Sequence, residues 1–201
     1  MAYRNFRFAD LSQQFGIRQT TGPLFSAKPA LVEPSAFLLE SIRLARTTPL
    51  TTEKAVSEAL VFPVLREIKI RNADLVELFS GENLEADRQR GLNGECDFIF
   101  TKTPGAVELQ APILTITEAK RGDIENPRSL AQAAAQLCGA RIFNQNHGQP
   151  VEMMYGFCTS GYEWVALQLT DSIVTIDSER YSIQNLPQLL GILQHVLDLS
   201  R

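Results

Sequence analysis

Two apolar segments decide the fold: LNGECDFIFTK at residues 92–102 and PILTITEAKR at residues 112–121. Each has the length of a strand and is rich in residues typical of strands. The turn-forming pair Pro104-Gly105 lies between them. The sequence therefore predicts two neighbouring strands joined as an antiparallel hairpin.

These two strands carry three charged residues in otherwise apolar surroundings. Asp97 lies inside the first strand, and Glu118 and Lys120 end the second. Residues two apart share a strand face, and a hairpin could bring Asp97 beside Glu118. Two convergent carboxylates form a hard oxygen site that suits Mg²⁺ or Mn²⁺, and a neighbouring lysine can polarise an attacking water. The pattern favours metal-dependent hydrolysis of a phosphodiester bond.

Two helices that flank these strands supply further candidates. We expect one helix to begin after Thr51-Thr52, with Glu58 on the same face as Phe62 and Leu65. A carboxylate on a core-facing stripe is unusual because its burial is costly, so Glu58 is a candidate site residue. A kink is expected at Pro63 in the same helix.

The second helix is the alanine-rich run that follows the strand pair. It is expected from Pro127 to about Asn144, with Asn126 as its cap. Gln132 and Gln136 lie one turn apart on it, although glutamines in such helices are often plain surface residues, Gln136 in particular.

The remaining segments complete an α/β or α+β pattern with a mixed sheet flanked by helices. Before the strand pair we expect a helix at 35–46 capped by Ser35, and a strand at 73–86 with a turn at 80–83. After it we expect a strand at 151–161, two further strands and a closing helix. Residues 1–33 show no clear long element, so 1–50 are interpreted as an N-terminal extension that packs on a domain formed by 51–201.

The acidic residues and their strands resemble a known group, the PD-(D/E)XK superfamily of restriction-endonuclease-like nucleases. Asp97 followed by Glu118-Ala119-Lys120 is similar to its motif, and Cys96 stands where the motif often has proline. The resemblance covers residues 52–160, which would form the αβββαβ core of that fold. GLNGECDFIF and ITEAKR are also similar to small bacterial members, cyanobacterial ones among them.

The resemblance implies a specific site. Asp97, Glu118 and the backbone carbonyl of Ala119 would hold Mg²⁺ or Mn²⁺, and Glu58 would assist through water or a second metal. Lys120 would position the nucleophile.

On the same resemblance, Gln132 would orient Lys120 or the substrate. The substrate would be nucleic acid, DNA before RNA, and many members of the group act as homodimers.

Composition sets outer limits. The chain has 201 residues, 44% hydrophobic and 21% charged, which suits one globular domain. Three widely spaced cysteines and the absence of a signal-like start favour a cytoplasmic protein without disulfides, and no apolar run is long enough to suggest a membrane partner.

Charge bears on the partner. The net charge of −4 argues against non-specific coating of nucleic acid. The N-terminal segment together with Lys120, Arg121 and Arg128 could still give one basic face for substrate, against the alternative of ordinary surface scatter.

Other interpretations remain open at this stage. Asp97 could make a structural salt bridge, Glu118 and Lys120 could be a solvated strand end, and Glu58 could pair with Arg66. The whole chain could be a catalytically inactive nuclease-like domain that binds nucleic acid or protein. Residues 1–50 could also dock onto another protein.

Overall fold

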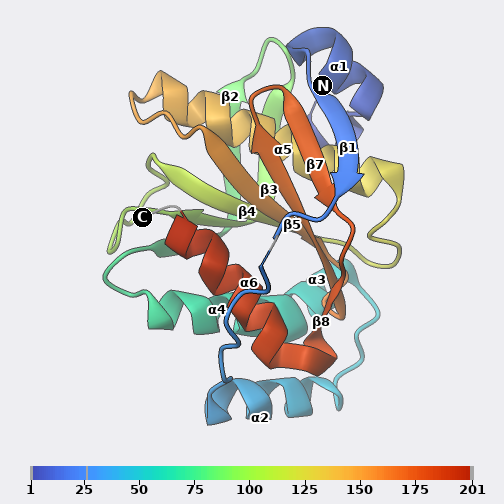
Figure 1. Cartoon of the computed structure of the whole chain (residues 1–201). Coiled ribbons are helices and arrows are strands. Elements are labelled where there is room, and N and C mark those ends of the chain that lie inside the picture. The colour runs from blue at the N-terminus through green and yellow to red at the C-terminus, as the bar shows by residue number, and fades with distance from the viewer. Residues whose placement is uncertain (1, 26, 200–201) are drawn as a thin grey trace.

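The computed structural model describes residues 2–25 and 27–199. It is built around one mixed sheet of eight strands with helices on both faces (Figure 1). Neighbouring strands follow the order β1-β7-β6-β5-β4-β3-β2, and β8 pairs with β6. The β4–β5 and β1–β7 pairs are parallel, and the other pairs are antiparallel. The expected α/β class with a mixed sheet is confirmed.

The elements have the following bounds. The strands are β1 (Arg18–Gly22), β2 (Glu77–Asp87), β3 (Leu92–Thr101), β4 (Ile113–Ala119), β5 (Met153–Thr159), β6 (Glu163–Thr170), β7 (Ile173–Asp177) and β8 (Tyr181–Ser182). The helices are η1 (Tyr3–Asn5), α1 (Phe8–Phe15), α2 (Ala36–Ala45), α3 (Glu53–Val56), η2 (Ser57–Val61), α4 (Phe62–Arg71), α5 (Pro127–Asn146), η3 (Ile183–Asn185) and α6 (Leu186–Leu199).

Local sequence patterns predicted the starts of three helices correctly. The side chains of Ser35, Thr52 and Asn126 accept hydrogen bonds from backbone N–H groups in the first turns of α2, α3 and α5. The strand pair β3 and β4 is antiparallel, as its turn residues predicted. These elements depend on short-range patterns, which explains why the sequence alone located them.

One expectation about a strand is wrong. The turn expected at 80–83 is absent, because β2 runs through it and pairs with β3 on both sides. Gly81 accommodates the local irregularity there with a φ of +71°, which costs glycine little. The expected extension also contributes structure to the sheet, since β1 pairs with β7 along one edge and Tyr3 and Phe6 are buried in the core.

The helix predicted after Thr52 changes its winding midway. Ser57–Val61 forms a π-helical turn, in which the N–H of Phe62 donates to the carbonyl of Ser57. Pro63 follows directly and has no N–H to continue an α-helical ladder. The kink expected at Pro63 therefore takes the form of a wide turn just before it.

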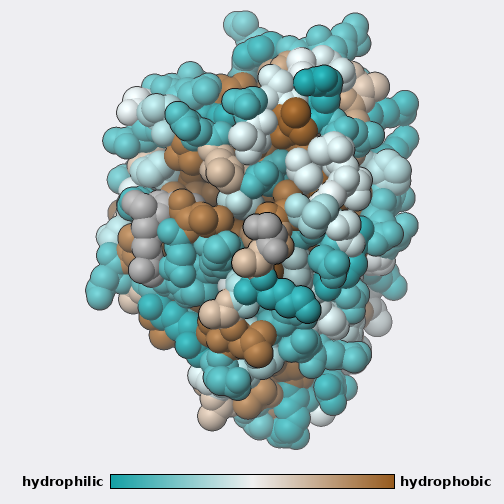
Figure 2. All heavy atoms as spheres, viewed as in Figure 1, coloured by the Kyte–Doolittle hydropathy of each residue, from teal (hydrophilic) through white to brown (hydrophobic). Residues whose placement is uncertain are grey.

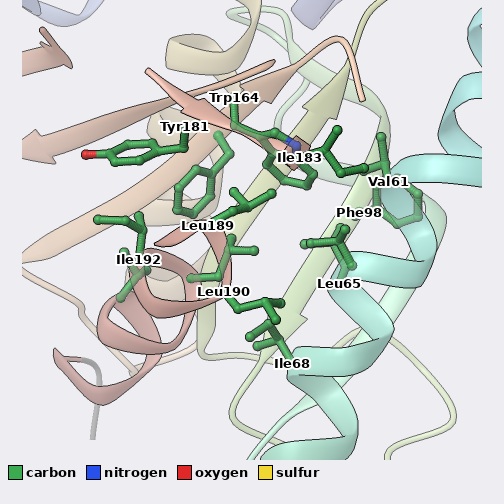
Figure 3. Close-up of a cluster of buried hydrophobic side chains, with 14 of the residues drawn as sticks. Val61, Leu65, Ile68, Phe98, Trp164, Tyr181, Ile183, Leu189, Leu190 and Ile192 are labelled. Carbon is green, nitrogen blue, oxygen red and sulfur yellow. The ribbon is translucent and has the colours of Figure 1, made fainter. Parts of the chain in front are cut away.

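Two apolar cores lie on opposite faces of the sheet. One is formed with α2, α4 and α6, and Figure 3 shows Leu65 and Ile68 of α4 facing Leu190 of α6. The other lies under α5 and α1. The candidate site borders this second core, on the side of the sheet that α5 covers.

Trp164 belongs to the first core. It is fully buried and packs edge-on against Phe157 with ring centroids 6.2 Å apart, so it is a core residue as expected. The three cysteines are buried free thiols.

The surface is mostly polar. Figure 2 shows a largely hydrophilic face on which hydrophobic side chains form separate small groups. Among the helices of residues 2–25 and 27–199, none combines the length and the apolar character that crossing a bilayer requires.

Candidate active site

The candidate site lies where β3 and β4 stop pairing. Phe98 opposite Thr117 is the last regular pair of the two strands at this end. Beyond it, the backbone N–H of Ala119 donates to the Asp97 carboxylate over 2.7 Å. The side chain of Asp97 thus replaces a strand-to-strand backbone bond, which holds its carboxylate at the same end of β4 as Glu118.

Glu118 is the buried centre of the site. Its side chain is only 3% exposed. The Lys120 ammonium donates to one carboxylate oxygen over 2.5 Å, and Gln132 donates to the same oxygen. The amide of Gln136 donates to the other oxygen over 2.5 Å. Three donors, one directly after β4 and two from α5, therefore hold this carboxylate in one orientation.

Lys120 connects the buried carboxylate to solvent. Its side chain is 18% exposed, and its ammonium also lies 3.9 Å from the Glu53 carboxylate. Its backbone N–H donates to the carbonyl of Thr159 at the end of β5, which fixes its position beside the sheet. The ammonium thus faces acidic groups on two sides.

The charge of Asp97 acts on Glu118. Burial, followed by the charge of Asp97, raises the pKa of Glu118 to about 7. Burial also raises the pKa of Asp97, although the Ala119 N–H and the charge of Lys120 oppose that rise. Burial lowers the pKa of Lys120, but Glu118, Glu53 and Asp97 outweigh it and raise that pKa above its usual value. Negative charge is therefore concentrated in this pocket of the fold beyond what one ammonium offsets.

The prediction that Glu58 lies on a core-facing stripe is wrong. Its side chain is 68% exposed and its carboxylate lies 3.8 Å from the Lys54 ammonium. The π-helical turn has one more residue per hydrogen-bonded ring than an α-helix, so it shifts the phase between Glu58 and Leu65. Glu58 consequently does not join Asp97, Glu118 and Lys120 in the structure.

Glu53 is the acidic residue that this helix brings to the site. It is the first residue of α3, and its carboxylate accepts from the backbone N–H of Arg121 over 3.1 Å as well as facing Lys120. Its side chain is half-exposed. The only sequence feature that marks Glu53 is its position directly after the Thr52 cap. That position gives no indication of Lys120, 67 positions away, as a partner.

The remaining candidate site residues differ in how far they are buried. Gln136, expected at the surface, is fully buried, and its side-chain oxygen has no hydrogen-bond partner among the described residues. Gln132, expected to orient Lys120 or the substrate, donates to the same Glu118 oxygen as Lys120. Arg121 and Arg128 are exposed near the start of α5, one on each side of the loop that joins β4 to this helix.

The donor set is compatible with a hard divalent cation. Within the residues that the structure describes, no three His, Cys, Asp or Glu side chains form a metal-holding group. The site offers two carboxylates, Asp97 and Glu118, next to the Ala119 carbonyl. Mg²⁺ is commonly bound through one or two carboxylates with water and substrate oxygens completing its shell, so two carboxylates that repel each other fit such an ion.

A comparison with known protein families finds none that matches this sequence, and a comparison with curated proteins finds no matching relative.

Proposed function

We propose that this chain is a metal-dependent phosphodiesterase of the PD-(D/E)XK type that hydrolyses DNA. The observation that carries the proposal is the convergence of Asp97, Glu118 and Lys120 at the diverging ends of β3 and β4. The element order α4, β2, β3, β4, α5, β5 is the order expected of an αβββαβ core and supports the same proposal.

Each residue has a role that its contacts suit. Asp97, Glu118 and the Ala119 carbonyl would hold Mg²⁺ or Mn²⁺, which supplies Lewis-acid activation of the phosphodiester and of water. The Lys120 ammonium would stabilise negative charge as it grows on the attacked phosphate. Gln132 and Gln136 would keep the Glu118 carboxylate turned towards the site.

A cleavage assay tests this proposal. Single-stranded and duplex DNA and RNA are incubated with the full chain and Mg²⁺ or Mn²⁺. Asp97→Ala and Lys120→Ala should each lower the rate by about 10²–10³-fold or more. Activity that survives either substitution, or survives EDTA, contradicts the assignment.

Two acids of the same helical region provide a matched pair for this assay. Glu53 faces Lys120, whereas Glu58 is exposed beside Lys54. Glu53→Gln should lower the cleavage rate and Glu58→Gln should leave it unchanged. The reverse result would restore the role first expected for Glu58.

One observation favours a second candidate, a catalytically inactive nuclease-like domain. Both oxygens of Glu118 already accept hydrogen bonds, from Lys120, Gln132 and Gln136. A cation must share or displace those donors. Calorimetric titration with Mn²⁺ separates the two candidates, because an inactive domain would bind no ion even at millimolar concentration.

A further inference from the structure

A row of side chains on α5 leads from the candidate site to the surface. Arg128, Gln132 and Gln136 are spaced by four residues, so they follow one helix face. Gln136 is fully buried, Gln132 is half-buried and Arg128 is exposed. Because both glutamines contact Glu118, Arg128 lies on the same face about 6 Å further along the helix axis.

Arg128 faces an open cavity shared with the N-terminal segment. The cavity has a volume of about 500 Å³, and its lining residues are Arg7, Phe8, Gln19, Asn126, Pro127 and Arg128. They come from α5, from the start of α1 and from the edge strand β1. The cavity therefore lies between the expected N-terminal extension and the helix that holds the site, and none of its described lining residues is a carboxylate.

The two arginines of this cavity are not neutralised. Within the described part of the chain, neither Arg7 nor Arg128 has a carboxylate within ion-pair distance, in contrast to five arginines that do. Neighbouring acids are engaged elsewhere, since Glu125 pairs with Arg180 and Asp10 accepts from the backbone N–H of Arg7. Two guanidinium groups on one open cavity are suited to bind phosphate oxygens.

We propose that the Arg7–Arg128 cavity binds a backbone phosphate of the DNA strand, about two nucleotides from the phosphodiester that lies at Lys120. The inference rests on the proposed function for its substrate and adds the direction that the strand takes. In a duplex each nucleotide advances about 3.4 Å, so the roughly 6 Å between Gln132 and Arg128 corresponds to about two nucleotides. The strand would run from the ends of β3 and β4, past the first turn of α5, towards α1 and β1.

A binding experiment in EDTA tests this inference without cleavage. Fluorescently labelled single-stranded and duplex DNA oligonucleotides are titrated with the full chain at several salt concentrations. The double variant Arg7→Gln/Arg128→Gln should weaken binding at least about tenfold at low salt. The slope of log K against log salt should also become shallower by about 0.7–0.9, as for one lost phosphate contact.

The control removes equal charge from the other side of the sheet. Lys28 and Arg46 are exposed and have no ion pair within residues 2–25 and 27–199. Lys28→Gln/Arg46→Gln should change affinity less than about threefold, with melting temperatures of both double variants compared to exclude misfolding.

The outcomes are distinguishable. Equal losses in the two double variants, or no DNA binding by the unaltered chain, would overturn the inference. Tighter binding of RNA of the same sequence would overturn the assignment to DNA. If binding depends on Arg7 and Arg128 but divalent cations support no cleavage, the hydrolysis proposal fails and the phosphate contact stands.

Discussion

Two buried glutamates in this protein have opposite electrostatic character. Glu67, on α4, is 7% exposed and Glu118, at the end of β4, is 3% exposed. Each has one cationic partner, Arg71 for Glu67 and Lys120 for Glu118. Low exposure and a salt bridge are thus common to both, and the two carboxylates differ in how deeply they lie and in their other neighbours.

The neighbours of Glu67 are all hydrogen-bond donors. Ser35 donates to it from both its backbone N–H and its hydroxyl, over 3.1 and 2.7 Å, and Arg71 donates from two nitrogens. Burial raises the pKa of Glu67, but these donors outweigh burial and lower it below the usual value. Glu67 is therefore a structural carboxylate, which ties α4 to the cap of α2.

Glu118 has donors too, but it also faces a second carboxylate. Burial and the charge of Asp97 together raise its pKa to about 7 in spite of Lys120 and Gln136. A second acid beside a buried acid does not stabilise the fold. Such arrangements are enriched at functional sites. The contrast indicates that burial together with a repelling neighbour, where hydrogen-bond donors do not offset them, marks a carboxylate as a candidate for cation binding.

The largest effect on stability is expected at the structural carboxylate. Glu67→Ala should lower the free energy of unfolding by about 2–3 kcal/mol, because it removes charge-assisted hydrogen bonds and leaves Ser35 and Arg71 without their acceptor. Chemical denaturation measures this loss.

The response to Mn²⁺ provides the control for Glu67→Ala. The melting temperature should rise on Mn²⁺ addition as much in this variant as in the unaltered chain, since Glu67 is not part of the candidate site. A variant that lost the Mn²⁺ response would contradict the division between the two glutamates.

The next effect concerns pH. A folded-state pKa of about 7 for Glu118, above the usual 4.5, contributes stability below about pH 4.5 that is lost as pH rises to 7. Asp97→Asn removes the repelling charge and keeps an oxygen for the Ala119 N–H. This variant should gain stability relative to the unaltered chain as pH rises from 5 to 8, by about 1.4 kcal/mol for each unit that the pKa of Glu118 falls.

Urea unfolding at a series of pH values measures this gain. Glu67→Ala serves as the comparison, because its pH dependence should change only near the lowered pKa of Glu67, where the stabilising charge is lost as pH falls. Parallel pH curves for Asp97→Asn and the unaltered chain would show that Asp97 does not act on Glu118.

The sequence predicted the centre of the candidate site because that centre depends on local order. Strand length, a Pro-Gly turn and a two-residue spacing were enough to bring Asp97, Glu118 and Lys120 together. The caps of α2, α3 and α5 are equally local.

The sequence did not predict features that depend on phase or on distant contacts. Glu58 was expected to face the core from regular α-helical spacing, which the π-helical turn before Pro63 interrupts. Strand β1, RQTTG, lacks apolar alternation because most of it is exposed at the edge of the sheet. Glu53 reaches the site only through the tertiary fold.

The smallest effect on stability is expected at Gln136. The nitrogen of its side-chain amide stabilises the fold, whereas the oxygen destabilises it. Its amide donates to Glu118, while its oxygen is buried without a partner among the described residues. Gln136→Met removes a favourable donor and an unfavourable acceptor of similar worth, so the free energy of unfolding at pH 6 should change by less than about 1 kcal/mol. The lost donor should nevertheless raise the pKa of Glu118 further, because this hydrogen bond lowers it.

Stability at pH 8 relative to pH 6 then separates the two effects of Gln136→Met. This variant should lose more stability over that interval than the unaltered chain, the opposite sign to Asp97→Asn, because a higher folded-state pKa extends the loss to higher pH. A large loss already at pH 6 would instead mean that the side-chain oxygen of Gln136 has a stabilising partner, and that Gln136, like Ser35 beside Glu67, is mainly structural.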